Sequence, residues 1–151
     1  MPARFTPLAL AAMLLLPLPA GATLGGPPSS VAADRTALSA THRAAISRNG
    51  YTINEMADRA TVVREYLSAD GVVFAIAWEG NLHPDLSQLL GGYAGEYSAA
   101  RQKAPRVAGR RRQRLVTGSM VVETWGHMRG LRGRAYLPAR LPSGVSVHEI
   151  R

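Results

Sequence analysis

The segment that most constrains the fold is 72–78, which is apolar at every position and directly follows Asp70-Gly71. In an extended strand its even-numbered residues (valine, phenylalanine, isoleucine and tryptophan) face one side, and its odd-numbered residues (valine and two alanines) face the other. A strand that is apolar on both faces is usually buried on both faces. The sequence therefore predicts a central strand of a sheet that is covered on each side.

Further strands are expected on both sides of this segment. The residues before it alternate between apolar and polar side chains, and Asp70-Gly71 favours the positive φ angles of a tight hairpin turn. Near the end of the chain, Pro138 and Pro142 stop regular structure. The expected strands are 51–56, 61–67, 72–78, one or two within 115–124, and 134–137.

One main helix is expected at about 84–100. Pro84 suits the first turn of a helix, and Asp85 is well placed for the helix dipole. Apolar side chains then form one helical stripe, which consists of Leu86, Leu89, Leu90, Tyr93 and Tyr97. Gly91, Gly92 and Gly95 weaken this helix by up to about 1 kcal/mol each relative to alanine.

A short N-terminal helix is also expected at about 31–45, where Ser30 can act as its cap. Asn49-Gly50 then marks a turn. The pattern as a whole predicts the α+β class, with a small antiparallel sheet of about five to six strands and the main helix packed on one face.

The first 22 residues have the pattern of a cleavable signal peptide. A short n-region with one arginine precedes the apolar run 8–16, and the small residues at 20–22 suit a signal peptidase. The expected organisation is a signal peptide at 1–22, a leader with the short helix at 23–50, and a single domain at 51–151. No later segment is long and apolar enough to span a membrane. Export by the general secretory route, to the periplasm or the medium, is predicted.

The chain has no cysteine, which excludes disulfides, cysteine nucleophiles and thiolate metal sites. The four histidines are far apart in sequence. His83 and Asp85 resemble half of a metal site, but their position at the start of the expected helix favours capping roles. No metal site and no cofactor are predicted.

The net charge of +8 is unevenly distributed along the sequence. Residues 101–134 contain ten basic side chains and one acidic one, and 101–114 is predicted to be a solvated basic loop. Its candidate polyanion-binding residues are Arg110, Arg111, Arg112 and Arg114. Export makes lipid phosphates and acidic glycans the available polyanions, and no aromatic residues that could stack bases are interleaved with these arginines. Nucleic acid is therefore not the expected partner.

A second candidate surface combines aromatic, imidazole and guanidinium groups close to one bend of the chain. It consists of Trp125, His127, Arg129 and Tyr136. These residue types can line a binding cleft for a ligand or a protein partner. The alternative is an ordinary bend between two strands with a half-buried tryptophan.

Hydrolase chemistry is the other class that the sequence leaves open. Ser146 and His148 would point the same way on a strand, but no acid is arranged to orient the histidine. Carboxylates that could act as a pair in glycoside cleavage are Glu55, Glu65, Asp70 and Glu79. For Glu55 and Glu65 the alternative is surface ion pairing with Arg59 and Arg64. No catalytic residue is assigned.

Several short blocks give the chain a family resemblance. These are 24–27 with Asp34, 51–55, 63–66, 71–78, 84–86 with 89–91, 126–129, 133–138 and 141–145. With them the chain resembles an exported proteobacterial family, domain of unknown function 2844. The resemblance implies no activity, and residues 110–114 lie between the matching blocks.

The sequence thus predicts a small exported bacterial protein that serves as a non-enzymatic binding or accessory module of the cell envelope. The expected partner is an envelope protein or an anionic envelope component. The alternatives are a periplasmic hydrolase and a binder of envelope polyanions through the arginine-rich segment.

Overall fold

The fold is a single seven-stranded antiparallel sheet with a different covering on each face. The computed structural model describes residues 24–27, 41–57, 59–105 and 111–151. The strands are β1 (Thr41–Arg48), β2 (Tyr51–Ala57), β3 (Thr61–Ser68), β4 (Val73–Gly80), β5 (Arg112–Val116), β6 (Val121–His127) and β7 (Gly130–Tyr136). Their order across the sheet is β1-β2-β3-β4-β7-β6-β5.

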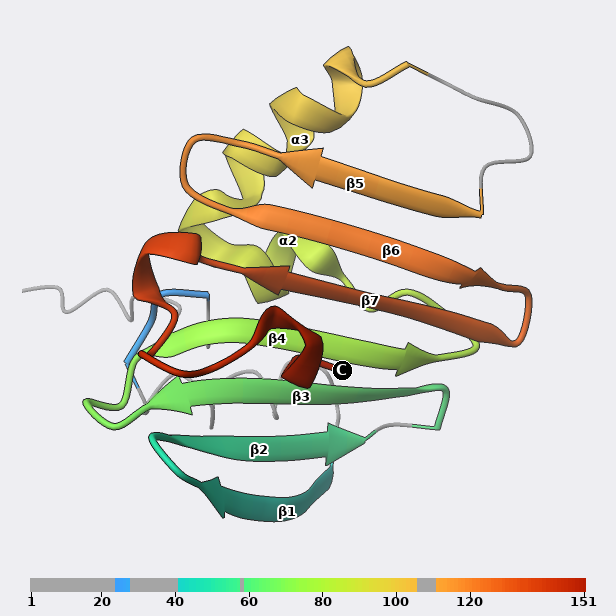
Figure 1. Cartoon of the computed structure of the whole chain (residues 1–151). Coiled ribbons are helices and arrows are strands. Elements are labelled where there is room, and N and C mark those ends of the chain that lie inside the picture. The colour runs from blue at the N-terminus through green and yellow to red at the C-terminus, as the bar shows by residue number, and fades with distance from the viewer. Residues whose placement is uncertain (1–23, 28–40, 58, 106–110) are drawn as a thin grey trace, which may run out of the picture.

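The sheet consists of two meanders that meet at β4 and β7 (Figure 1). Strands β1 to β4 follow one another as hairpins, and the chain then leaves the sheet through a helical segment. It returns at the far edge and comes back through β5, β6 and β7, so that β7 pairs with β4 from Ala75↔Tyr136 to Gly80↔Leu131. This topology makes β4 an interior strand, as its apolar sequence predicts.

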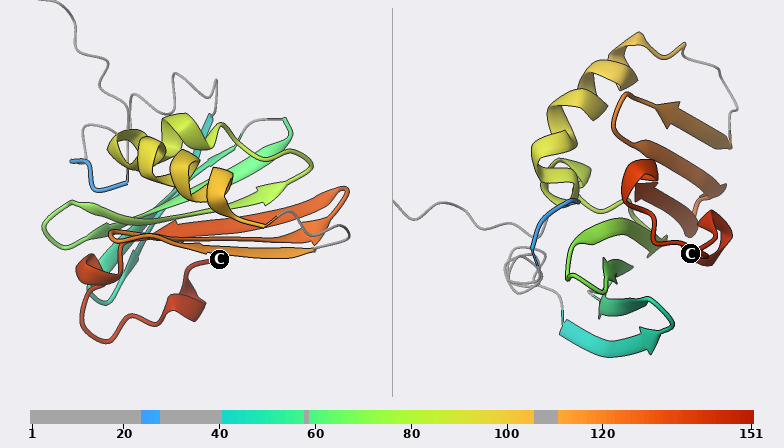
Figure 2. Two further views of the ribbon diagram at one scale, coloured as in Figure 1. Left: turned by 90° about the horizontal axis from the view of Figure 1, so that it is seen from above. Right: turned by 60° about the vertical axis from the view of Figure 1, so that its left-hand side comes forward.

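The helical segment covers one face of the sheet (Figure 2). It consists of α2 (Leu86–Leu90), a 3-10 turn η1 (Gly91–Tyr93) and α3 (Ala94–Lys103). Asp85 caps α2, because its Oδ1 accepts the backbone N–H of Ser87 at 2.9 Å. Leu89 and Leu90 are fully buried against the sheet.

The predicted helical stripe is thus confirmed, although the helix is interrupted at the predicted glycines. Gly91 ends α2 with a positive φ of 48°, a conformation that glycine adopts without the steric cost of a Cβ. α3 contains no buried residue, and only Ala94 and Tyr97 of this helix pack against the core.

The last part of the chain covers the opposite face (Figure 2). It contains the 3-10 turns η2 (Pro138–Arg140) and η3 (Val147–Glu149). Ile150 is fully buried there among the side chains of Tyr51, Tyr66 and Phe74, and Leu141, Val145 and Val147 pack around them. Two hydrophobic layers therefore lie on the two sides of β4, as expected for a strand that is apolar on both faces.

The alternation predicted for 72–78 breaks at one position. Tyr66 pairs with Ala75 but Leu67 pairs with Val73, so Phe74 is the extra residue of a β-bulge. Phe74 consequently faces the same side as Ala75, while Val73, Ile76 and Trp78 face the helices.

Two features differ from the predicted α+β arrangement of five to six strands. The sheet has seven strands, and residues 41–45, predicted as the end of a short helix, belong to β1. Asn49-Gly50 forms the hairpin turn that pairs β1 with β2, and Gly50 has a φ of 87°. The sheet thus includes residues 41–48, ahead of the predicted start of the domain at residue 51. The rest of the predicted helix, 31–40, lies outside the described residues, as does the predicted signal peptide.

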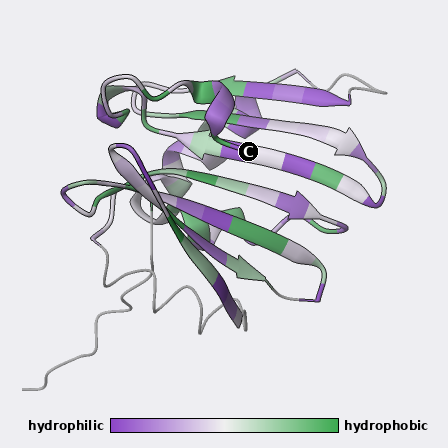
Figure 3. Ribbon diagram, turned by 60° about the horizontal axis from the view of Figure 1, so that its bottom comes forward, coloured by the Kyte–Doolittle hydropathy of each residue, from purple (hydrophilic) through white to green (hydrophobic). Residues whose placement is uncertain are grey.

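The two ends of the predicted basic loop at 101–114 belong to regular structure. Arg101 to Lys103 form the last turn of α3, and β5 begins at Arg112. Residues 106–110 lie outside the described part of the chain. β5 is an edge strand that is hydrophilic over most of its length, as Figure 3 shows, which protects the edge from pairing with another chain.

Candidate functional site

Two large grooves flank the sheet, one on each face. The first, which we call the C-terminal groove, lies between the sheet and residues 143–151 and has a volume of about 960 Å³. The second, the arginine groove, lies between the end of α3 and the strands β5 and β6 and has a volume of about 860 Å³. Both are within or near the size range of small-molecule sites. Their charges distinguish them.

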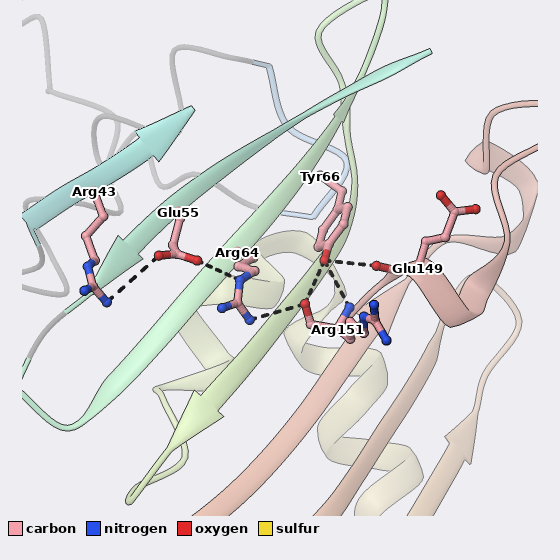
Figure 4. A network of polar contacts seen from close by, with 6 residues as sticks. All are labelled: Arg43, Glu55, Arg64, Tyr66, Glu149 and Arg151. Atoms are coloured by element: carbon pink, nitrogen blue, oxygen red, sulfur yellow. Dashed lines mark hydrogen bonds and ion pairs between the residues drawn. The ribbon is translucent and has the colours of Figure 1, made fainter. Parts of the chain in front are cut away.

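Ion pairs compensate much of the charge in the C-terminal groove. Glu55 accepts the Nε–H of Arg64 at 2.8 Å, and its other oxygen lies 3.9 Å from Arg43 Nη1 (Figure 4). Glu79 accepts the Nε–H of Arg132 at 2.9 Å across the β4–β7 junction. Each of these carboxylates is therefore engaged by at least one guanidinium, an arrangement that favours a structural role.

A third cluster stands beside this groove on the same face. Glu123 accepts the Nε–H of Arg134 at 2.6 Å, and its other oxygen lies 3.1 Å from Arg114 Nε. Arg134 also donates to the carbonyl of Val147 at 2.6 Å, and its guanidinium carbon lies 5.5 Å from the ring centre of Trp125. This arginine links β7 to the last segment of the chain.

Tyr66 anchors that segment at the centre of the sheet (Figure 4). Its hydroxyl donates to the carbonyl of Arg151 at 2.9 Å and accepts the N–H of the same residue at 3.0 Å. Burial raises the pKa of Tyr66, so the hydroxyl stays protonated and available as a donor. Glu149 accepts the Tyr51 hydroxyl at 3.0 Å. The C-terminal groove is thus bordered by contacts that hold the chain to itself.

The arginine groove has a different electrostatic character. Arg101 comes from the last turn of α3, Arg111 directly precedes β5, and Arg112 is its first residue. All three are exposed, and within the described residues none of them forms an ion pair. The described residues that line the groove are His83, Ser98, Arg101, Gln102, Ala104, Pro105, Arg111, Arg112, Gln113, Thr124, Trp125, Gly126 and Leu131. No carboxylate is among them.

His83 contributes a neutral polar group to the arginine groove. Its Nδ1 accepts the indole N–H of Trp78 at 3.1 Å, so the neutral ring carries its proton on Nε2. Partial burial and, secondly, the positive charge of Arg101 lower the pKa of His83. At neutral pH the ring is therefore an uncharged donor with a fixed tautomer.

Trp78 is itself fixed by the packing of the sheet. It is 2% exposed and lies across Gly133 of β7, where a Cβ would overlap with the indole ring. The absence of a side chain at Gly133 thus lets Trp78 reach His83. From the sequence, His83 is interpreted only as a cap or as half of a metal site. Its role as the hydrogen-bond acceptor of Trp78 has one sequence signal, which is the spacing of five residues between the two.

The predicted surface of Trp125, His127, Arg129 and Tyr136 does not assemble as one site. Trp125 is partly exposed and lines both grooves. His127 and Arg129 are exposed at the β6–β7 turn, where Arg129 has a positive φ of 70°. Tyr136 is the last residue of β7, so the length of the strand separates it from the turn. It is buried there, opposite Val121. The grouping with Tyr136 is therefore wrong.

The four arginines proposed for polyanion binding separate into two described groups. Arg111 and Arg112 line the arginine groove, whereas Arg114, two residues further along β5 than Arg112, pairs with Glu123. Arg110 lies outside the described residues. Arg101, which belongs to the same basic stretch of sequence, joins Arg111 and Arg112 because α3 ends beside β5.

The candidate hydrolase residues have structural roles. Ser146 caps η3, since its Oγ accepts the backbone N–H of His148 at 3.2 Å and its own N–H donates to Glu149 Oε1 at 2.8 Å. Glu55 forms the expected pair with Arg64, whereas Glu65 is fully buried on the helix side and is not a surface residue. Asp70 lies in the β3–β4 turn, where the Ser68 hydroxyl lowers its pKa. Within the described residues, no three histidine or acidic side chains form a group that could hold a metal ion.

Comparison with known proteins identifies the family. A family model described as "Protein of unknown function (DUF2844)" matches residues 20–150, which is most of the chain. The chain belongs to this family. No curated protein and no solved structure matches it. Within the described residues of this DUF2844 protein, no helix has the length and apolar character needed to cross a membrane.

Proposed function

We propose that this protein is an exported, non-enzymatic binding module of the bacterial cell envelope, and that its ligand is an anionic envelope component held in the arginine groove. One observation carries the proposal. Three exposed guanidinium groups from two elements line one groove, and no carboxylate among the described lining residues neutralises them.

The charge of this groove favours an anionic ligand for two physical reasons. Like charges placed close together repel one another, and a bound oxyanion relieves that repulsion while it accepts the guanidinium donors in bidentate geometry. Uncompensated positive charge in a concave site also concentrates anions from solution. Arg43, Arg64, Arg114, Arg132 and Arg134, by contrast, each already face a glutamate.

Export is the second part of the proposal and is supported by sequence. Residues 1–22 have the pattern of a signal peptide. The family match covers residues 20–150, so most of the signal-peptide pattern lies before the matched region. In the envelope the available polyanions are lipid phosphates and acidic glycans. A non-enzymatic role is supported because the candidate serine serves as the cap of η3, and two of the candidate carboxylates are paired with arginines.

The test of export is the mass of the N-terminal peptide. The chain is expressed with its own residues 1–22 in a Gram-negative host, and the protein in the periplasmic fraction is analysed by mass spectrometry. We expect a processed chain that begins at Thr23. An unprocessed chain in the cytosolic fraction would contradict this part of the proposal without affecting the groove.

The test of the groove compares two triple variants of equal charge. Three proteins are eluted with salt from a sulfated polysaccharide column. They are the unchanged exported chain, the groove variant Arg101→Gln/Arg111→Gln/Arg112→Gln, and the control variant Arg59→Gln/Arg129→Gln/Arg140→Gln. The control arginines are exposed elsewhere on the molecule. We expect the groove variant to elute at clearly lower salt than the control, with the dependence of log K on log salt reduced by about 2 to 3. Equal elution of the two variants would refute the groove as the binding site.

A further inference from the structure

The arginine groove contains more than charge. Ser98, Gln102, Gln113 and Thr124 line it together with the neutral imidazole of His83. These are hydroxyl, amide and ring N–H groups that both donate and accept hydrogen bonds without a net charge. Attraction of a bare polyanion requires only the arginines, whereas uncharged donors and acceptors recognise uncharged polar groups such as hydroxyls.

His83 is positioned before any ligand arrives. The hydrogen bond from Trp78 occupies Nδ1, and Trp78 is held between β4 and Gly133 of β7. The remaining ring nitrogen, Nε2, therefore carries a donor whose orientation is set by the core of the sheet. A donor fixed in this way loses little conformational entropy when it binds an oxygen atom of a ligand.

Trp125 adds an apolar surface to the same groove. The guanidinium of Arg134 lies 5.5 Å from its ring centre, and Glu123 neutralises that arginine. The indole thus leaves the sheet on the face of Glu123 and Arg134, and it is partly exposed at the border of both grooves. A pyranose ring presents a face of C–H groups that packs against such a flat aromatic surface.

The size of the groove agrees with a ligand larger than a single oxyanion. Its volume of about 860 Å³ is in the upper part of the range of small-molecule sites, and a phosphate or sulfate ion would fill only a small part of it. Its charged groups stand at α3 and β5, and Trp125 stands on β6. A ligand that engages all of them must itself combine charge with rings.

We propose that the ligand of the arginine groove is an acidic oligosaccharide. Its sulfate, phosphate or carboxylate groups bind Arg101, Arg111 and Arg112, one sugar ring packs on Trp125, and its hydroxyls bond to the amides and to Nε2 of His83. This inference rests on the proposed function, because it names the class of anion that the groove takes.

The test measures the affinity of the exported chain for four probes by calorimetry at one ionic strength. The probes are a sulfated hexasaccharide, a hexamer of galacturonic acid, inorganic polyphosphate of matched charge, and phosphatidylglycerol vesicles. The variants are Trp125→Ala, the pair Gln102→Ala/Gln113→Ala, and Arg111→Gln/Arg112→Gln. The control is Arg59→Gln/Arg140→Gln, which changes the charge by the same amount on exposed residues outside the groove.

We expect at least one acidic oligosaccharide to bind more tightly than polyphosphate and the vesicles. Trp125→Ala and the glutamine pair should each weaken oligosaccharide binding about tenfold and polyphosphate binding less than about twofold, while the arginine pair weakens both. The two oligosaccharides separate sulfate from carboxylate as the preferred charge. If Trp125→Ala unfolds, as its thermal transition would show, the glutamine pair on the surface decides.

Three results would overturn the inference, and they differ in what else they affect. If polyphosphate or vesicles bind best, the ligand is a bare polyanion or a lipid surface, and the proposed function stands without the saccharide. The same holds if the tryptophan and glutamine variants leave oligosaccharide affinity unchanged. If no probe binds, both the inference and the proposed anion site are wrong.

Discussion

Gly133→Ala is the substitution whose effect the structure defines most sharply. A Cβ at this position would lie inside the van der Waals radii of Cζ2 and Cε2 of Trp78, and 2.9 Å from the carbonyl oxygen of Glu123. Ordinary contacts between carbon atoms are about 3.5 to 4.0 Å long. The methyl group therefore cannot be accommodated unless the indole ring or the β6–β7 pairing moves.

Neither neighbour can move without further loss. Trp78 is 2% exposed among core side chains, and its N–H bonds to His83 at 3.1 Å. Overpacking a core typically lowers the free energy of unfolding by 1 to 3 kcal/mol. Because the surroundings of Gly133 are rigid, we expect a cost at the upper end of this range, about 3 kcal/mol. Displacing the ring from His83 adds about 1 kcal/mol for the lost hydrogen bond. We expect Gly133→Ala to lower the free energy of unfolding by about 4 kcal/mol, a large part of the total of a domain of this size.

A double-mutant cycle measured by urea unfolding separates this clash from other effects. Trp78→Phe removes the indole atoms that the methyl group would meet, and by itself should cost about 2 kcal/mol for the lost volume and hydrogen bond. The double variant should then be about 2 kcal/mol more stable than the sum of the single changes predicts. Gly95→Ala is the control, because a Cβ there meets open space on α3, and it should stabilise the protein by up to about 1 kcal/mol.

The reasoning is refuted if Gly133→Ala costs less than about 1 kcal/mol, or if its effect and that of Trp78→Phe add within about 0.5 kcal/mol. Additivity would mean that the alanine acts through the backbone of β7 and not through the indole. The position of His83 provides a second measurement, since its imidazole proton resonances should shift in Gly133→Ala and stay unchanged in Gly95→Ala.

Two further predictions concern the segment that covers the opposite face. Tyr66→Phe removes a buried hydroxyl that bonds to both the N–H and the carbonyl of Arg151; it should cost about 1 to 3 kcal/mol, and hydrogen exchange should rise first at residues 149–151. Glu149 has a pKa below its usual value, chiefly because it accepts the Ser146 N–H and secondly the Tyr51 hydroxyl. Its contribution to stability is therefore present above about pH 4.5 and lost as the pH falls through the lowered value, so Glu149→Gln should lower the urea midpoint at pH 7 and have a much smaller effect near pH 2.

The sequence predicts the parts of the fold that depend on local pattern. The central position of β4 follows from seven consecutive apolar residues, and the helical stripe follows from the spacing of Leu86, Leu89 and Leu90. The sequence does not predict β1, because this edge strand is exposed along most of its length. Its sequence therefore lacks the alternation of apolar and polar residues that indicates a half-buried strand. The bulge at Phe74 was missed because it depends on the register with β3, which no local pattern encodes.

The candidate site was only partly predictable for a similar reason. Counting arginines identifies a basic stretch, but which of them are neutralised depends on pairs between distant strands. Arg132 finds Glu79 across the junction of the two meanders, and Arg114 lies two residues from Arg112 yet pairs with Glu123. The grouping of Tyr136 with Trp125 is wrong because the two residues stand at opposite ends of the β6–β7 hairpin. Trp125 pairs with Arg132 near the turn, whereas Tyr136 pairs with Val121 at the open end.

The distribution of acidic residues explains why the arginine groove carries free charge. Residues 101–134 contain one glutamate, Glu123, and the fold uses it for two arginines on the C-terminal side of the sheet. Both are tied to packing, since Arg134 also holds the last segment through Val147. Arg101, Arg111 and Arg112 line the arginine groove, where no described lining residue is acidic. The one glutamate of this stretch is thus already engaged by Arg114 and Arg134, which is why the described lining of the arginine groove keeps a net positive charge.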